Sequence, residues 1–181
     1  MKQLLVIVGL PGSGKDTQIE SLAKRKKFEV IRVGDLVREK AKTDPQVAED
    51  LAQGNLADNA MVNQLIDESI RNFPEQSYII SDGFPRDLEQ AEWLVDYLHE
   101  NQVELVGALH IKISDEVALQ RLTKRGRDDD QEEIIAHRLE VFHQQTGAVV
   151  EFFRSRGKLI EIDGSGTPDE VEHSIKAALG W

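Results

Sequence analysis

The chain has 181 residues, of which 40% are hydrophobic and 30% charged, a balance that suits one folded domain with a sizeable core and excludes a disordered chain. Its net charge of −11 argues against a general nucleic-acid-binding protein, because such a protein needs a basic face. It contains no cysteine, which excludes disulfides and thiolate zinc sites.

Segments of strand length alternate with amphipathic helical segments along the chain. Strands are predicted, in chain order, at residues 4–8, 30–33, 78–81, 105–113 and 159–162. Capping chemistry predicts helix starts after Asp44, after Ser114, and after Thr167, where Glu170 completes a capping box. The alternation predicts a single α/β domain over residues 1–181, with a five-stranded parallel sheet in the middle of three α/β/α layers. Ligands bind such sheets at the carboxyl ends of the strands.

The first motif follows the first predicted strand and reads Gly9-Leu10-Pro11-Gly12-Ser13-Gly14-Lys15. Such a P-loop lets backbone N–H groups converge on phosphate oxygens, and its lysine adds a mobile positive charge. The usual P-loop places Ser or Thr next, to touch Mg²⁺, but here Asp16 precedes Thr17. Two interpretations of Asp16 stay open: its carboxylate joins the water shell of Mg²⁺, or it repels the phosphates.

A second motif, Asp82-Gly83-Phe84-Pro85-Arg86, follows the strand predicted at 78–81. On residue chemistry alone, this motif is either a turn or a site in which the acid organises Mg²⁺ and the arginine binds a phosphate through its planar guanidinium. Both motifs resemble the adenylate kinase family, whose loop reads G-x-P-G-x-G-K-G-T-Q. The resemblance implies that Asp82 holds Mg²⁺ through water, Gly83 leaves room for the acceptor base and Arg86 clamps the acceptor phosphate. It assigns ATP binding to the loop residues Gly12, Ser13, Gly14, Lys15 and Thr17.

The acceptor site is expected to involve Gln90 and the segment 34–63. The Gln90 amide offers a donor and an acceptor, which suits the N6/N1 edge of adenine, although an ordinary helix glutamine is the alternative. The stretch from Val33 and Gly34 to Arg38 resembles the family's T-G-D-x-x-R, in which the arginine binds the acceptor phosphate. Valine in place of threonine loses a hydroxyl, which predicts looser base discrimination. The resemblance implies that residues 34–63 form a mobile helical insert that binds the nucleoside monophosphate, where pattern alone gives a helical hairpin. Within it, the base-wrapping residues would be Asn55, Leu56 and Ala57.

Four arginines stand out in the acidic chain: Arg121, Arg125, Arg127 and Arg138. Arg121 and Arg125 share a helix face, and Arg127 and Arg138 would share one if a single helix carried both. The alternative is a solvated face paired with neighbouring acids. The resemblance implies that Arg121 lies against the ATP adenine, that the other three bind phosphate, and that Gly166 belongs to a loop contacting the adenine. The family has a lid between the second and third of these arginines, where this chain has only Gly126, so the resemblance implies that residues 125–130 are a vestigial lid.

The resemblance runs from residue 4 to about residue 178 and implies reversible transfer of the ATP γ-phosphate to AMP, with Mg²⁺ as cofactor. Catalysis would rest on positioning and charge, without a protein nucleophile. Two alternatives stay open: a UMP/CMP or broad-specificity kinase, and a low-turnover adenylate sensor or assembly factor. We expect a cytoplasmic monomer that has ATP and AMP as its partners, with no nucleic-acid or membrane partner and no signal peptide.

Overall fold

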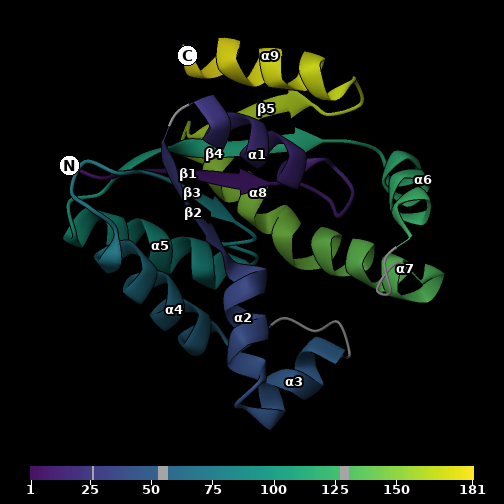
Figure 1. The fold of residues 1–181 in the computed structure, drawn as a ribbon, viewed down its shortest axis with the longest axis horizontal. Coiled ribbons are helices and arrows are strands. Elements are labelled where there is room, and N and C mark those ends of the chain that lie inside the picture. Colours follow the sequence, from purple (N-terminus) through teal and green to yellow (C-terminus); the bar gives the residue numbers. More distant parts are fainter. Residues whose placement is uncertain (26, 53–56, 127–130) are drawn as a thin grey trace.

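The computed structural model describes residues 1–25, 27–52, 57–126 and 131–181. It contains a sheet of five parallel strands, as predicted, and their order is β2-β3-β1-β4-β5 (Figure 1). The strands are β1 (Gln3–Val8), β2 (Phe28–Arg32), β3 (Tyr78–Asp82), β4 (Glu104–Lys112) and β5 (Leu159–Asp163). Their bounds lie within two residues of the predicted ones, a difference typical of strand ends.

Helices connect the strands and cover both faces of the sheet. They are α1 (Lys15–Arg25), α2 (Val33–Ala41), α3 (Pro45–Ala52), α4 (Asn59–Asn72), α5 (Leu88–Glu100), α6 (Asp115–Arg125), α7 (Glu132–Val141), α8 (Gly147–Ser155) and α9 (Pro168–Leu179), with a π-helical turn η1 (Phe142–Thr146) between α7 and α8. Two predicted caps are confirmed: the Ser114 side chain accepts from the Val117 N–H, and Thr167 and Glu170 form a reciprocal capping box. The helix start predicted after Asp44 is also confirmed, since α3 begins at Pro45.

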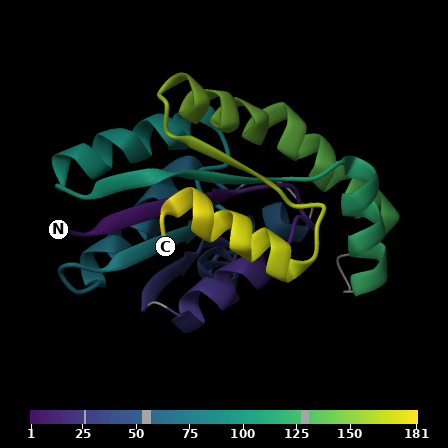
Figure 2. The same cartoon turned by 90° about the horizontal axis from the view of Figure 1, so that it is seen from above.

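The alternation of side chains along β1 divides the core in two. Leu4, Val6 and Val8 belong to the larger cluster, which includes buried residues of α4, α5 and α8. Leu5 and Ile7 belong to the other cluster, which α1 and α9 cover on the opposite face. Figure 2 shows α9 over one side of the sheet and α5 and α8 on the other. Because both faces of the sheet are buried, ligands can reach it only at the strand ends, where polar groups are available to bind them.

One detail of the sequence prediction is wrong. β2 ends at Arg32, and Val33 opens α2 instead of ending the strand. Its β-branched side chain, which favoured a strand, is buried in the larger core cluster from the first turn of the helix. Arg138 lies on α7, which begins at Glu132 after the extended residue Gln131, whereas α6 ends at Arg125 and is capped by the left-handed residue Gly126. The condition for a face shared by Arg127 and Arg138 is therefore not met.

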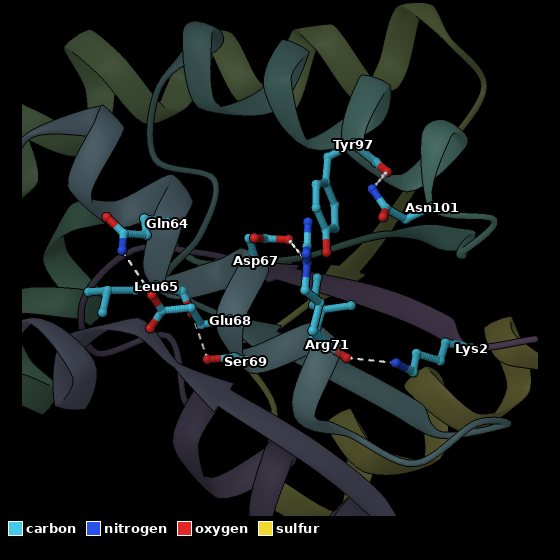
Figure 3. Close-up of polar contacts among 10 residues, drawn as sticks. Lys2, Gln64, Leu65, Asp67, Glu68, Ser69, Arg71, Tyr97 and Asn101 are labelled. Carbon is cyan, nitrogen blue, oxygen red and sulfur yellow. Dashed lines mark hydrogen bonds and ion pairs between the residues drawn. The ribbon is translucent and has the colours of Figure 1, made fainter.

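A polar seam between α4 and α5 consists of Asp67, Arg71 and Tyr97 (Figure 3). Arg71 Nε donates to Asp67 Oδ1 at 2.6 Å, one turn away on the same helix. Burial, together with the neighbouring Asp67 carboxylate, raises the pKa of Tyr97 to about 12. Beside the seam, Lys2 Nζ donates to the Ile70 carbonyl at 2.8 Å. The seam therefore brings Tyr97 of α5 beside the Asp67–Arg71 ion pair of α4, near the amino end of β1.

The carboxyl ends of the strands point toward α6 and α7, whereas both chain termini lie at the other end (Figures 1 and 2). The helices α2 and α3 project from the body of the domain in Figure 1. Within the described residues, every helix is too short or too polar to cross a membrane.

Candidate active site

The P-loop leads from β1 into α1 and is held open by its glycines. Gly12 has φ +82°, and a Cβ at this position would lie 3.0 Å from the Ala118 carbonyl oxygen of α6, so only glycine fits. The Ser13 N–H donates to the Leu10 carbonyl at 3.0 Å. The buried Ser13 hydroxyl has no hydrogen-bond partner among the described residues. An unsatisfied buried hydroxyl beside a helix N-terminus is ready to donate to an anion.

Lys15 is folded back onto its own loop. Its Nζ donates to the carbonyl oxygens of Gly9 at 2.6 Å and Leu10 at 3.2 Å. Burial lowers the pKa of Lys15 to about 8, although the negative charges of Asp82 and Asp16 oppose that shift. The Lys15 ammonium is therefore held where its charged form is disfavoured. A bound phosphate group would stabilise the charged form and raise the pKa again.

A cavity of about 510 Å³, which we call the loop cavity, opens beside the P-loop. All the described residues predicted to bind ATP line it: Gly12, Ser13, Gly14, Lys15, Asp16, Thr17, Arg121 and Gly166, together with Arg125 and Arg138. Arg121 Nη2 lies 3.4 Å from the Ser165 carbonyl in the loop after β5. The predicted face shared by Arg121 and Arg125 is confirmed, since both line this cavity.

A second cavity of about 420 Å³, which we call the insert cavity, lies between the ends of β2 and β3 and the segment from α7 to η1. Predicted site residues that line it are Lys15, Asp16, Gly34, Arg38, Asp82, Gly83, Arg86, Arg125 and Arg138. Five residues line both cavities: Pro11, Lys15, Asp16, Arg125 and Arg138. Two anionic ligands, one in each cavity, would therefore meet at a junction containing three cationic side chains.

Asp82 lies at the carboxyl end of β3, between positive and negative neighbours. Its Oδ2 is 3.5 Å from Nη1 of Arg32, the residue paired with it in register on β2. Burial raises the pKa of Asp82; Lys15 opposes the shift and Asp16 adds to it. Two carboxylates that repel each other in a partly buried site fit a divalent cation, which would relieve both.

The donor set around this site suits Mg²⁺ shared with a substrate. Over the described ranges, no three His, Cys, Asp or Glu side chains gather as a complete metal cage. Mg²⁺ is commonly bound by one or two carboxylates plus substrate phosphates and water, and Asp82 and Asp16 supply that number at the insert cavity.

Arg86 is held tightly in the loop after β3. Its Nε donates to the Gly83 carbonyl at 2.8 Å. Gly83 has φ +78°, and a Cβ there would lie 3.1 Å from Arg86 Nη2, so glycine leaves room for the guanidinium. Burial lowers the pKa of Arg86, and Asp82 opposes this shift. The guanidinium, which stays charged at any ordinary pH, is therefore presented to the cavity in a poorly solvated position.

Several predicted acceptor residues do not line the insert cavity. Gln90 is buried: its Oε1 accepts from the Arg86 N–H at 2.8 Å, and its Nε2 donates to Asn59 Oδ1 at 2.6 Å. Val33 is also buried, and Ala57 packs against the larger core cluster. Asn55, Leu56 and Arg127, and most of the predicted lid at 125–130, lie outside the described residues.

The structure adds two residues that the sequence prediction missed. Arg32 lines the insert cavity and approaches Asp82; its place at the end of a strand was a usable signal. Thr146 also lines the cavity and donates to the Arg86 carbonyl at 2.8 Å. No local pattern predicts that contact, because the partners lie 60 residues apart in sequence.

Comparison with known proteins agrees with this geometry. The family model described as adenylate kinase matches residues 7–158. A protein named adenylate kinase from Thermus thermophilus is 36% identical over 186 residues, covering 98% of this chain and 97% of the relative. An adenylate kinase from Maricaulis maris is 36% identical, with 97% of each chain covered. One from Synechococcus sp. is 32% identical and covers 99% of this chain and 100% of its own.

Proposed function

This chain belongs to the adenylate kinase family, and on that premise we propose that the loop cavity holds ATP and the insert cavity holds AMP. Its activity is ATP-dependent phosphoryl transfer to AMP, giving two ADP. The observation that carries the placement of the substrates is the junction of the two cavities at Lys15, Asp16, Arg125 and Arg138. An in-line transfer needs donor and acceptor phosphates to meet in such a cationic junction.

Phosphoryl transfer asks the protein for position and charge, because negative charge spreads over the oxygens of the transferred group. In our proposal the P-loop backbone, Ser13 and Lys15 hold the donor phosphates, while Arg125 and Arg138 face the group in transfer. Arg38 and Arg86, which line the insert cavity alone, would hold the AMP phosphate. No side chain needs to act as a nucleophile.

Three further proposals concern the ATP side. Arg121 and Gly166 line the loop cavity away from the junction, where the adenine would lie. Mg²⁺ would be held by Asp82 through water, with Asp16 close to it, and would neutralise phosphate charge when bound. Arg127 would add a further phosphate-binding arginine.

The acceptor side is proposed on fewer contacts. Residues 34–63 would act as the acceptor-binding insert, with Val33, Asn55, Leu56 and Ala57 around the base, Gly83 leaving room for it and Gln90 reading its adenine edge. Residues 125–130 would be a very short lid. Since one chain supplies the described residues that line both cavities, we propose a monomer. We place it in the cytoplasm, where ATP and AMP are used.

A coupled assay of ADP formation with ATP, Mg²⁺ and a panel of AMP, CMP, UMP and GMP tests this function. We expect kcat/KM for AMP to exceed the others at least tenfold, on the order of one well-placed polar contact. The Gln90→Leu variant should lose most of this preference. Equal kcat/KM for AMP and CMP would contradict the acceptor assignment and favour a broad-specificity kinase. If no ADP forms with any of the four nucleoside monophosphates, the result would favour an adenylate sensor.

A further inference from the structure

The backbone of Arg86 is held by side chains from two different helices. Its N–H donates to Gln90 Oε1 of α5, and its carbonyl accepts from Thr146 Oγ1 of η1, both at 2.8 Å. Thr146 and Gln90 are both buried. Arg86 itself lies in the connection between β3 and α5, outside any helix or strand. In such a connection, side-chain hydrogen bonds take the place of the regular bonds that would fix the backbone.

Thr146 reaches Arg86 from the helical run that carries another arginine of the site. This run is continuous from α7, which carries Arg138, through the π-helical turn to α8. Phe142 and Thr146, the first and last residues of that turn, both line the insert cavity. A π-helical turn inside a helix is a costly local geometry, and such turns occur often at functional sites.

We propose that Thr146 is a positioning residue for the acceptor phosphate: its hydroxyl fixes Arg86 relative to Arg138 across the insert cavity. The proposal deepens the proposed function and rests on it. Arg86 lines only the insert cavity, whereas Arg138 lines both cavities. Their separation therefore sets how the AMP phosphate faces the junction. A shift of a fraction of an ångström in one arginine would misalign the acceptor oxygen with the group in transfer.

The test removes the hydroxyl while keeping the side-chain volume. In Thr146→Val, we expect kcat/KM for AMP to fall about tenfold or more, the loss typical of a misplaced catalytic contact. The dissociation constant of ATP, measured by calorimetry, should stay within about twofold, because Thr146 does not line the loop cavity. The Thr146→Ser variant keeps the donor and should recover most of the loss.

A matched control removes a hydroxyl bond of the same kind from the same helical run. Ser155 Oγ donates to the Phe152 carbonyl at 2.9 Å and lines neither cavity. Ser155→Ala should leave AMP kinetics unchanged. If Thr146→Val only lowers Tm and leaves kcat/KM for AMP within twofold, or if Thr146→Ser fails to recover it, the proposal is overturned.

The proposal can fail separately from the proposed function. Absence of ADP formation by the unmodified protein would reject the kinase function itself. AMP affinity, measured by calorimetry without turnover, then still tests Thr146. In that assay an unchanged AMP dissociation constant in Thr146→Val would reject the positioning role, and a weaker one reversed by Thr146→Ser would support it. Should the valine variant not fold, Thr146→Ala replaces it in each assay.

Discussion

Two clusters of charged side chains hold their charges in opposite ways: the seam between α4 and α5, and the junction of the two cavities. The junction is taken together with Asp82 and Arg86, which lie beside it in the insert cavity. In the seam, the hydrogen bond that Arg71 donates to Asp67 raises the pKa of Arg71 and so favours the charged form. At the junction, burial lowers the pKa of Lys15 and of Arg86 and raises that of Asp82. Each of these three shifts disfavours the charged form.

This difference separates a site prepared for charged ligands from a polar cluster whose charges are paired with each other. The seam pairs its charges with each other at 2.6 Å on one helix face. The junction keeps poorly solvated cations and carboxylates in place, which costs free energy until phosphate and a divalent cation arrive. We therefore expect changes at the junction to alter function with little loss of stability, and changes in the seam to do the reverse.

The largest effect is expected from Arg86→Ala. Removing this guanidinium should lower kcat/KM by about 10³-fold or more, the scale of arginines that stabilise phosphoryl transfer. Tm should stay the same or rise, because the variant no longer holds a poorly solvated charge. Arg86→Lys keeps the charge but loses the planar guanidinium, so its kcat/KM should lie between those of the unmodified protein and Arg86→Ala. Near-normal turnover in Arg86→Ala would remove the distinction between junction and seam. Arg127→Ala, outside the described residues, is expected to lose as much activity.

The next effect is a pH dependence set by Lys15. In the free protein this lysine loses its proton as pH rises through about 8, compared with 10.5 ordinarily. Between these values the unfolded chain binds more protons, so this group makes the folded state more stable as pH rises. ATP binding has the opposite sign, since phosphate needs the charged form. ATP affinity should fall about tenfold from pH 7.5 to 9. Calorimetry at both values checks this, and Lys15→Arg, which stays charged, should lose the dependence. A constant affinity would contradict it.

The sequence predicted the parts of the two cavities that follow strands directly. The P-loop after β1 and the Asp82–Arg86 loop after β3 are local motifs, and the parallel sheet brings their ends together. The start of the C-terminal helix α9 is also set by a local motif, because Thr167 and Glu170 form its capping box within one turn. Such features depend on residues only a few positions apart, so their pattern can be recognised directly in the sequence.

The rest depends on contacts between distant segments. The bond from Thr146 to Arg86 and the one from Gln90 to Asn59 join residues 60 and 31 positions apart, and no periodicity announces them. The π-helical turn that brings Thr146 into place has no residue pattern that distinguishes it from an ordinary α-helix. Val33 was assigned to a strand because valine favours strands, yet tertiary burial placed it in a helix.

A smaller effect is expected at Asp16, which lines both cavities beside Asp82. Its carboxylate should repel metal-free ATP and attract the metal of Mg·ATP. Asp16→Gly and Asp16→Asn should therefore both tighten metal-free ATP binding by about threefold, as expected for charges several ångströms apart in water. Mg·ATP binding should change much less. Titration of ATP with Mg²⁺ and with chelator measures the difference. An equal change in the two conditions would mean that the carboxylate points to solvent.

The smallest effect is expected in the seam, from Asp67→Asn. The amide can still accept from Arg71, but the ion pair is lost, and an exposed pair four residues apart on a helix contributes little. Tm should fall by about 1–2 °C, and the difference should shrink at high salt. Kinetic constants for ATP and AMP should not change.

An optical titration gives this variant a direct readout. The negative charge of Asp67 helps to raise the pKa of Tyr97, so its removal should lower that pKa from about 12. The chain has only two tyrosines, Tyr78 and Tyr97, so ultraviolet titration resolves the shift. A fall in kcat/KM would mean that the seam transmits to the insert through α4, whose first residue, Asn59, bonds Gln90. The two clusters would then be parts of one system, and the stability of the seam would have to be counted among the determinants of acceptor binding.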